Sequence, residues 1–377
     1  MPAFKEKYPN VNVTVESSGV DQVYQKLSAG FSSGGSGLPD VTQIENNRIA
    51  SFTEQFPDAF TNLSEMGYDE HADKFPEAKL EGLKDAEGNI IAMPRDLGPV
   101  GLMYRVDIFK EAGVDPTSIK TWDDYIEAGK KVVDHTGNYL LGGYDDNLLR
   151  VMMQQQGSYY FNEEGKLNIT SEAGQKAADV LQRLKDEELI TFTNNWDGHV
   201  AAMKNGEVAT QPGAVWWSGT MIEQMPELSG KWDMVPLPAM EEGGTRASNN
   251  GGSALGVPSS SDNKAAAYAF AEFATTDVDS QIKALQNRGL FPALTTAYEE
   301  PEFSENQEYF NNEPFFQKFA EVVPEIPAVN HDGAELEVRS IMGSEIEAFM
   351  LEDKPAADML EEGENRASQQ TSKETTN

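Results

Sequence analysis

The stretch MPRDLGPVGLMYRVDIFKEAGV, residues 93–114, contains in order a Pro/Gly-rich segment, a strand and a helix. The segment PRDLGP is short and rigid, because each proline fixes its own φ angle. The apolar run VGLMY is typical of a strand, and VDIFKEAGV continues it into a helix. The stretch therefore predicts that the first hundred residues end at a boundary and that a new strand–helix block begins there.

Strand and helix patterns alternate on both sides of this boundary. VNVTVESSG, residues 11–19, alternates valines as a strand does, and DQVYQKLSAGF, residues 21–31, has helical spacing. Helices are also predicted at TWDDYIEAGKKVVDH, residues 121–135, and DNKAAAYAFAEFATT, residues 262–276. Strands that alternate with helices from end to end predict an α/β fold with mainly parallel sheets.

The length of the chain, 377 residues, predicts two lobes because one ordinary core does not grow to that size. A second boundary is predicted at ASNNGGSALGVPSSSDN, residues 247–263, which is rich in Gly, Ser and Asn but holds a short apolar strand. The last stretch, residues 361–377, is polar with little to bury, so we expect it to be a mobile tail.

The charge balance narrows the class of ligand. Asp and Glu total 63 against 29 Lys and Arg, which gives a net charge of −34. Nucleic acids and anionic membranes would be repelled by that field, so a neutral or cationic ligand is favoured. There are no cysteines, which excludes disulfides, thiolate catalysis and Cys-bound metals. No stretch approaches the roughly 20 apolar residues of a membrane helix.

The stretch QPGAVWWSGTM, residues 211–221, places Trp216 and Trp217 side by side. If AVWWS is extended, neighbouring side chains point to opposite faces, so one indole enters the core and the other faces a cleft. A flat apolar ring with a polar rim suits the C–H face of a pyranose. The alternative is that both indoles pack in a core or between lobes.

Polar side chains cluster at the predicted ends of strands, where open α/β sheets place their ligands. Carboxylates and amides there can bind hydroxyl groups, although capping of the following helix is the alternative. Asp96, between proline and glycine, is a further candidate, with an ion pair or a turn as its alternative role. The clustered residues are Gln43, Glu45, Asn46, Asn47, Asp145, Asp146 and Asn147.

Sequence signatures of enzymes are missing. The chain has no GxSxG, HExxH or Walker motif, and its four histidines lie far apart without the spacing of metal ligands. We therefore expect no catalytic residues, no metal and no cofactor. A pair of carboxylates that acts on a glycosidic bond stays open, because such a pair is defined by its separation in space.

Several segments, in this order, resemble the extracellular solute-binding proteins of carbohydrate ABC transporters, in particular the maltose-binding-protein-like group and the sugar-binding lipoproteins of Gram-positive bacteria. They span nearly the whole chain: YPNVNVTVE, PDVTQIENN, GNIIAMPRDLGPVGLMYRVDIFKEAGV, TWDDYIEAGKKV, AAMKNGEVATQPGAVWWSG and GGSALGVPSSSDNKAAAYAFAEFATT. Members of this family have a strand ahead of the helix that MPAFKEKYP closes, so the resemblance implies that this sequence lacks that strand and is part of a longer protein.

The resemblance implies a two-lobed periplasmic-binding-protein type II fold. One lobe would be 1–104 with 254–303, and the other 105–253 with 304–360. It also implies hinged closure on a carbohydrate, which is then delivered to the membrane permease subunits of an ABC importer. The protein would be a monomer that is anchored outside the cell as a lipoprotein and binds no nucleic acid.

The resemblance also assigns roles to residues. It makes Trp217 the stacking residue, with Trp216 in the core, and it gives the clustered polar residues and Asp96 contacts with the sugar. Ile44 stands where the maltose-binding group has an aromatic platform, so stacking there is not expected. Further ligand contacts are expected from Trp196, Gly251, Gly252, Asn330 and His331.

Two other functions stay open. A receptor of the same fold could bind a polyamine or a peptide, since an acidic pocket suits a cation. A glycan-active enzyme with paired carboxylates is the other alternative, and turnover of an oligosaccharide would identify it.

Overall fold

The computed structural model describes residues 2–85, 87–352 and 354–376. The chain forms two units, Met1–Leu97 with Gly251–Ala297 and Gly98–Asn250 with Tyr298–Asn377. The chain passes between the units after Leu97, Asn250 and Ala297, a few residues before the expected positions 104, 253 and 303. The first two passages nevertheless lie inside the two segments that the sequence predicted as boundaries.

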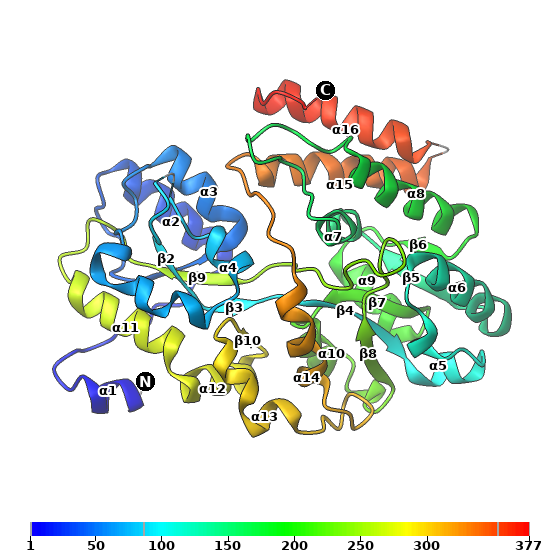
Figure 1. The fold of residues 1–377 in the computed structure, drawn as a ribbon, viewed down its shortest axis with the longest axis horizontal. Coiled ribbons are helices and arrows are strands. Elements are labelled where there is room, and N and C mark those ends of the chain that lie inside the picture. The colour runs from blue at the N-terminus through cyan, green and yellow to red at the C-terminus, as the bar shows by residue number, and fades with distance from the viewer. Residues whose placement is uncertain (1, 86, 353, 377) are drawn as a thin grey trace. The chain divides into compact units, whose positions relative to one another are not determined.

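The first unit contains a three-stranded and a two-stranded sheet with helices on both sides (Figure 1). Helix α3 contacts strand β1, and helix α11 contacts strand β2. The helices and strands of this unit are α1 (Pro2–Lys7), α2 (Val20–Ser32), β1 (Thr42–Glu45), α3 (Asn46–Gln55), α4 (Glu77–Glu81), β2 (Ala92–Pro94), β3 (Asp96–Leu97), β9 (Ser253–Gly256), α11 (Lys264–Thr276), α12 (Val278–Arg288) and β10 (Phe291–Pro292).

The second unit is built on a five-stranded sheet in the order β6-β5-β7-β4-β8. Its elements are β4 (Val100–Arg105), α5 (Val106–Glu111), α6 (Trp122–Thr136), β5 (Tyr139–Gly143), α7 (Asn147–Gln155), α8 (Glu172–Asp186), β6 (Ile190–Phe192), α9 (Trp196–Asn205), β7 (Val208–Ala214), α10 (Trp217–Gln224), β8 (Trp232–Pro236), α13 (Pro301–Ser304), α14 (Phe315–Val322), α15 (Glu335–Leu351) and α16 (Ala356–Thr371).

The helices predicted from periodicity are present, and local signals set their ends. The Thr121 side chain accepts the Asp124 N–H at 3.2 Å, and the Asp124 carboxylate accepts the Thr121 N–H at 2.9 Å. This capping box satisfies backbone donors that the first turn of α6 would otherwise leave free. Gly137 ends the helix in a left-handed conformation, with φ of 72°.

The prediction of mainly parallel sheets is wrong, because one central strand in each unit is reversed. Strand β9 runs antiparallel to both β1 and β2, and β4 runs antiparallel to both β7 and β8. Strand β5, in contrast, is parallel to β6 and β7. Both reversed strands directly follow a passage of the chain from one unit to the other. They are therefore not entered through the helical crossover that makes neighbouring strands parallel.

The strand predicted for residues 11–19 is not formed. These residues have no strand assignment, and Val15 is 69% exposed. Alternating valines favour a strand only where another strand pairs with them and a core covers one face. No such pairing is found for this segment among the described residues.

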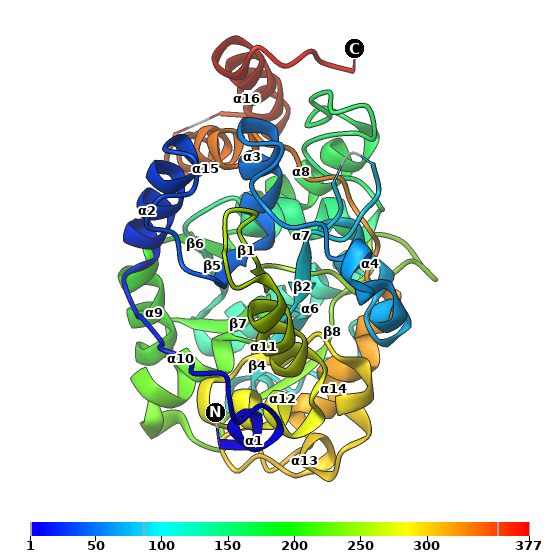
Figure 2. The same cartoon turned by 90° about the vertical axis from the view of Figure 1, so that its left-hand side faces the viewer.

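The mobile tail predicted for residues 361–377 is also wrong, because most of it belongs to helix α16. Figure 2 shows α16 above α15, and α16 contacts both α15 and α8. Met359, Leu360 and Ala367 are buried there. After the helix, the N–H of Thr376 donates to the carbonyl of Leu167 at 3.0 Å. A few buried side chains at helical spacing thus suffice to hold a mostly polar segment.

Each unit has its own apolar core. In the second unit a single cluster joins the sheet to α6, α7, α8, α15 and α16, while the first unit has a smaller cluster around β1, β2 and α3. The parallel strands β5 and β6 end at Gly143 and Phe192 on the same edge of their sheet. Open α/β sheets bind their ligands at such an edge.

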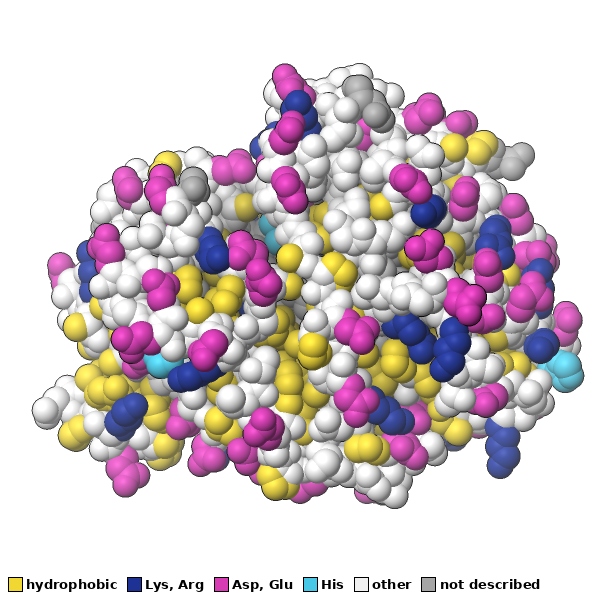
Figure 3. Space-filling model, viewed as in Figure 1, with side chains coloured by type: hydrophobic (Ala, Val, Ile, Leu, Met, Phe, Trp, Pro, Cys, Tyr) yellow, Lys and Arg dark blue, Asp and Glu magenta, His cyan; other side chains and the backbone are white. Residues whose placement is uncertain are grey.

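Carboxylates outnumber basic side chains on the surface that Figure 3 shows. Figure 3 shows Asp and Glu side chains spread over the visible face, with fewer Lys and Arg side chains between them. Within the ranges that the structure describes, no helix combines the length and the apolar character needed to cross a membrane.

Candidate ligand-binding site

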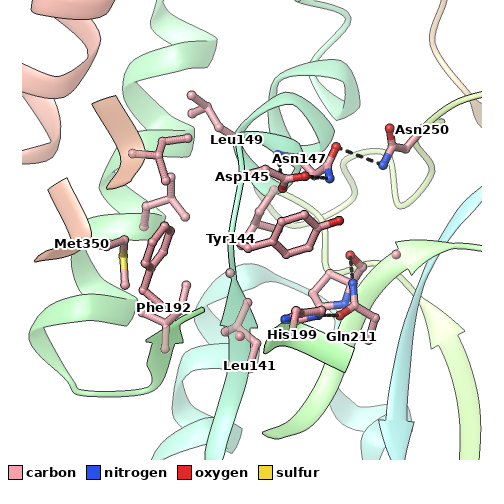
Figure 4. A pocket seen from close by; sticks show the side chains of 18 of the residues that line it. Leu141, Tyr144, Asp145, Asn147, Leu149, Phe192, His199, Gln211, Asn250 and Met350 are labelled. Carbon is pink, nitrogen blue, oxygen red and sulfur yellow. Dashed lines mark hydrogen bonds between the residues drawn. The ribbon is translucent and has the colours of Figure 1, made fainter. Parts of the chain in front are cut away.

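A pocket lies at the carboxyl end of β5 in the second unit. The space enclosed by its walls is about 50 Å³, well below the roughly 300–1,000 Å³ typical of small-molecule sites, so a ligand held here would extend into the adjoining solvent. One part of its lining carries hydrogen-bonding side chains and one indole, and we call this the polar part (Figure 4). Its residues are Tyr144, Asp145, Asn147, His199, Gln211, Trp217 and Asn250.

Three residues of the polar part hold one another in place. The Asn147 N–H donates to Asp145 Oδ1 at 3.1 Å, and Asn250 Nδ2 donates to Asn147 Oδ1 at 3.2 Å. Burial raises the pKa of Asp145 to about 6, and repulsion from Asp146 acts in the same direction, while Arg150 opposes it. Fixed amide and carboxylate groups of this kind can accept and donate hydrogen bonds to hydroxyl groups without reorganising.

His199 and Gln211 form the floor of the polar part. His199 Nε2 lies 2.5 Å from Gln211 Oε1, and Gln211 Nε2 donates to the carbonyl of Pro212 at 3.3 Å. Burial lowers the pKa of His199, so the imidazole is neutral at pH 7. Its Nδ1 is buried and has no hydrogen-bond partner in the described part of the chain. A Cβ at position 142 would lie 2.9 Å from this atom, which is why Gly142 fits there.

The two tryptophans do not lie in a strand. Strand β7 ends at Ala214, Trp216 lies in the turn that follows, and helix α10 begins at Trp217. Trp217 is 2% exposed, and its ring lies 4.2 Å from that of Trp196 in a stacked arrangement. Trp216 is partly exposed, and its Nε1 donates to the carbonyl of Asn250 at 2.9 Å. The assumption of an extended chain is therefore wrong, and the burial is the reverse of the expected one, since Trp217 is buried and Trp216 is partly exposed.

Asp146 is a structural residue rather than a ligand contact. Its side chain is 4% exposed and does not line the pocket. Arg150 Nε donates to Asp146 Oδ2 at 2.8 Å, and the Tyr160 hydroxyl donates to the same oxygen at 3.1 Å. The capping alternative is wrong for Asp146 as well, since its side chain makes no cap bond to α7, and Asp145 accepts the first N–H of that helix instead.

Asn330 and His331 lie outside the pocket. Asn330 Nδ2 donates to the carbonyl of Asn162 at 2.7 Å, and His331 Nδ1 lies 2.6 Å from Glu335 Oε2. Glu335 in turn accepts from the Tyr159 hydroxyl at 3.1 Å. His331 thus belongs to a network at the start of α15, whereas Asn330 is bonded to the backbone of another segment.

The first unit gathers a second polar set, at the end of β1 and the start of α3. Glu45 accepts from the Tyr24 hydroxyl at 3.2 Å and pairs with Arg48 at 3.5 Å. Gln43 is exposed and accepts from Arg95. Asn47 Oδ1 is buried without a hydrogen-bond partner in the described ranges. The structure therefore brings the predicted residues of this cluster together.

Asp96 and the two glycines adjoin this set. Asp96 Oδ1 accepts from the Ser253 N–H at 3.2 Å and from its hydroxyl. Gly251 and Gly252 have φ angles of 96° and 98°, and a Cβ on Gly252 would meet the Asp96 carbonyl at 2.8 Å. The glycines therefore shape the backbone here, because other residues rarely adopt these angles.

Lys79, which the sequence analysis missed, lies beneath this set. Its side chain is fully buried, and Nζ donates to Asn46 Oδ1 at 2.6 Å and to the Ser253 carbonyl at 2.8 Å. Burial lowers the pKa of Lys79 to about 7, while the charge of Asp96 opposes the shift. Lys79 thus fixes the side chain of Asn46, a predicted ligand contact.

We expect the stability of the protein to depend on pH through Lys79. Unfolded lysine has a pKa of about 10.4, so between pH 7 and pH 10 the unfolded chain binds more protons and stability rises with pH. The free energy of unfolding of the wild type, minus that of Lys79→Met, should therefore increase by about 3 kcal/mol from pH 7 to pH 9.5. Urea unfolding of both proteins at several pH values measures this difference. If the free energies of unfolding of the two proteins change in parallel with pH, the pKa of Lys79 is not lowered in the folded protein.

Sequence signals for the other missed residues were weak. His199 follows Trp196 by three positions in α9, so the two share a helix face, and Trp196 stacks on Trp217. Tyr144 precedes the predicted acidic cluster, Gln211 begins the stretch that contains the Trp pair, and Asn250 lies in a predicted boundary segment. Among the described residues, no group of three or more His, Cys, Asp or Glu side chains could hold a metal ion.

Comparison with known proteins gives a family match over most of the chain. Residues 1–280 match the family described as "Bacterial extracellular solute-binding protein". The chain is 33% identical to the lactose-binding protein of Rhizobium radiobacter over 87% of this chain and 78% of that protein. It is 31% identical to the arabinooligosaccharide-binding protein of Halalkalibacterium halodurans over 87% of this chain and 75% of that protein.

Solved structures share the fold. A crystal structure of an extracellular solute-binding protein of family 1 has a TM-score of 0.86 at 23% identity and covers 97% of this chain and 95% of its own. The ABC transporter associated binding protein from B. animalis subsp. lactis Bl-04, in complex with beta-1,6-galactobiose, has a TM-score of 0.74 at 24% identity. The match covers 98% of this chain and 94% of that chain. These likenesses confirm the predicted two-lobed α/β fold.

Proposed function

Because this chain belongs to the bacterial extracellular solute-binding proteins, we propose that it binds a carbohydrate and delivers it to the permease subunits of an ABC importer. The names of the relatives, which bind lactose and arabinooligosaccharides, support a sugar as the solute. The protein binds and releases the sugar without changing it chemically. It acts outside the cell, and we further propose that it is a monomer held at the cell surface as a lipoprotein.

The polar part of the pocket carries this proposal. It combines a carboxylate, three amides and a neutral imidazole with partly exposed indoles nearby, since Trp216 is bonded to Asn250 and Trp196 stacks on Trp217. Sugars need this combination, because their rings present apolar C–H faces and their edges present hydroxyl groups. We assign stacking to Trp216 and Trp196, and the hydroxyl contacts to Asp145, Asn147 and Gln211.

The energetics of these contacts favour selectivity. A hydrogen bond to a charged group contributes about 1.5–3 kcal/mol net, so a hydroxyl on Asp145 is a strong anchor. A sugar that lacks the matching hydroxyl leaves the buried carboxylate or amide unpaired, at a similar cost. We also propose that the polar set around Asn46 and Asn47 in the first unit binds hydroxyl groups, and the unpartnered Oδ1 of Asn47 supports this.

Calorimetric titration with lactose, β-1,6-galactobiose, arabinobiose, arabinotriose and maltose tests the proposal. At pH 7.5 the carboxyl group of Asp145 is ionised, since its pKa is about 6. We expect at least one of these sugars to bind with a dissociation constant of roughly 10 µM or lower, equivalent to about −7 kcal/mol, and to change the tryptophan fluorescence. Chromatography of the sugar after incubation should show no cleavage.

Two outcomes contradict this function. If no sugar releases heat while spermidine or a short peptide binds, the protein is a receptor for a cation or a peptide. If the bound sugar is hydrolysed, and the hydrolysis disappears in a variant of Asp145, the protein is a glycan-active enzyme.

A further inference from the structure

The contact between Lys79 and Asn46 fixes one member of the polar set in the first unit. Lys79 lies in α4, and Asn46 is the first residue of α3. The Asn46 side chain accepts from Lys79 Nζ, and its backbone N–H donates to the carbonyl of Gly252 at 3.1 Å. Asn46 is therefore held at its side chain and at its backbone before any ligand arrives.

The donors of Lys79 decide which end of the Asn46 amide faces it. A protonated lysine has three N–H donors and no acceptor, and a neutral one keeps two N–H donors. The structure gives Nζ two acceptors, Asn46 Oδ1 at 2.6 Å and the Ser253 carbonyl at 2.8 Å. Turning the amide would leave a fully buried N–H of Lys79 without its acceptor, which is costly. The amide oxygen of Asn46 therefore faces Lys79 in both protonation states.

The other end of the Asn46 amide is free to meet a ligand. The side chain is half-buried, and Nδ2 remains in contact with solvent without donating to any residue of the described ranges. At the next residue, Asn47, the atom that lacks a partner in those ranges is instead the acceptor Oδ1. Two consecutive residues of α3 thus leave a donor and an acceptor unpaired.

We propose that Asn46 contacts a sugar hydroxyl through Nδ2, as a donor, and that Lys79 is the positioning residue that holds the amide in this orientation. The hydroxyl oxygen accepts from Nδ2, and its proton is left for an acceptor of the same set, for which Asn47 Oδ1 is available. This inference rests on the proposed sugar-binding function and adds the polarity of one contact.

Replacing Asn46 with aspartate tests the polarity, because an oxygen takes the place of Nδ2 while the shape is kept. The probe is the sugar that binds the wild type most tightly in the calorimetric panel. Asn46→Asp should bind it about 5- to 100-fold more weakly, since the hydroxyl oxygen then has no donor at this position. Asn287→Asp adds the same charge at an exposed residue of α12, in the same unit, and should bind like the wild type. If Asn46→Asp binds as tightly as the wild type, Asn46 is an acceptor and the inference is wrong.

A double-mutant cycle tests the role of Lys79. Lys79→Met keeps the size of the side chain but removes its donors, so the Asn46 amide can turn, and binding should weaken about 2- to 10-fold. In an Asn46→Ala background the same change should alter the dissociation constant by less than about two-fold, because Lys79 acts on the sugar through Asn46. Equal losses in the two backgrounds would contradict a positioning role.

A spectroscopic arm does not depend on sugar binding. With isotope-labelled asparagine, the side-chain amide signal of Asn46 is identified by NMR from its loss in Asn46→Ala. Burial lowers the pKa of Lys79 to about 7, opposed by the charge of Asp96 and reinforced by that of Arg95. The group bonded to Oδ1 therefore changes its charge near pH 7, and the signal should shift with that midpoint in the wild type but not in Lys79→Met.

The two kinds of measurement separate the possible failures. If no sugar binds the wild type, the sugar-binding function is wrong, and the amide signal alone decides whether Lys79 fixes Asn46. A signal that does not move with pH in the wild type, or that moves equally in Lys79→Met, would overturn the inference.

Discussion

Replacing Trp216 with alanine is expected to weaken sugar binding about 30- to 1,000-fold, equivalent to about 2–4 kcal/mol, while the protein stays folded. Trp216 is the partly exposed member of the pair, and its Nε1 is bonded to the carbonyl of Asn250, whose side chain lines the pocket. The variant removes an apolar surface that a pyranose face would cover and releases this contact. Calorimetry measures the loss of affinity.

Trp217→Ala is the matched comparison for that variant. Trp217 is almost fully buried against Trp196, so its truncation leaves a cavity and should lower the free energy of unfolding by about 3–5 kcal/mol. Trp216→Ala should cost only about 1–2 kcal/mol, since it removes one hydrogen bond and partial packing. Urea unfolding followed by circular dichroism measures the stability loss of each variant. If Trp217→Phe abolishes binding without loss of stability while Trp216→Ala binds normally, the two roles are reversed.

The Trp pair shows where reasoning from sequence stopped. The parity argument assumed an extended chain, but the strand ends at Ala214 and a helix begins at once. Gly213 is the residue that allows this arrangement. A Cβ there would lie 2.6 Å from Trp217 Cδ1, so the glycine lets this indole pack against the strand end. A close approach of this kind depends on tertiary structure, and the sequence alone does not reveal it.

Local sequence patterns predicted individual helices better than they predicted which strands pair and in which direction. The helix at residues 121–135 was predictable because its cap and its periodicity lie within a few positions of each other. The directions of β4 and β9 were not, because they depend on where the chain passes between units. Residues 11–19 show the same limit, since alternating valines form a strand only beside another strand.

Site residues were predictable as clusters and not as individual roles. Asp145, Asp146 and Asn147 were all predicted to bind ligand, yet Asp146 is committed to Arg150 and Tyr160. Neighbours that differ by one position point in different directions, and only the fold decides which of them reaches the pocket. The buried Lys79 had no sequence signal, because a lysine in a short amphipathic helix is usually solvated.

Arg150→Met is expected to lower the free energy of unfolding by about 3–5 kcal/mol and to weaken sugar binding as well. The side chains of Arg150 and Asp146 are each 4% exposed, and the guanidinium also donates to the Tyr159 hydroxyl at 3.0 Å and to Asn147 Oδ1. Without this guanidinium, the buried Asp146 carboxylate keeps only the more distant Arg339, whose Nε lies 3.8 Å from Oδ2. Asn147 Oδ1 loses one of its two donors and keeps only the hydrogen bond from Asn250.

The exposed pair of Arg183 and Asp123 provides the control, because their side chains are 46% and 74% exposed. Arg183→Met should change the free energy of unfolding by no more than about 1 kcal/mol, since solvent screens such pairs. Adding Asp146→Leu to Arg150→Met removes the stranded charge and should restore much of the stability, but not the sugar affinity, because Asn147 still lacks the donor from Arg150. Urea unfolding and calorimetry on the same samples test both statements. A double variant that recovers full affinity would show that Arg150 acts only on stability and does not position Asn147.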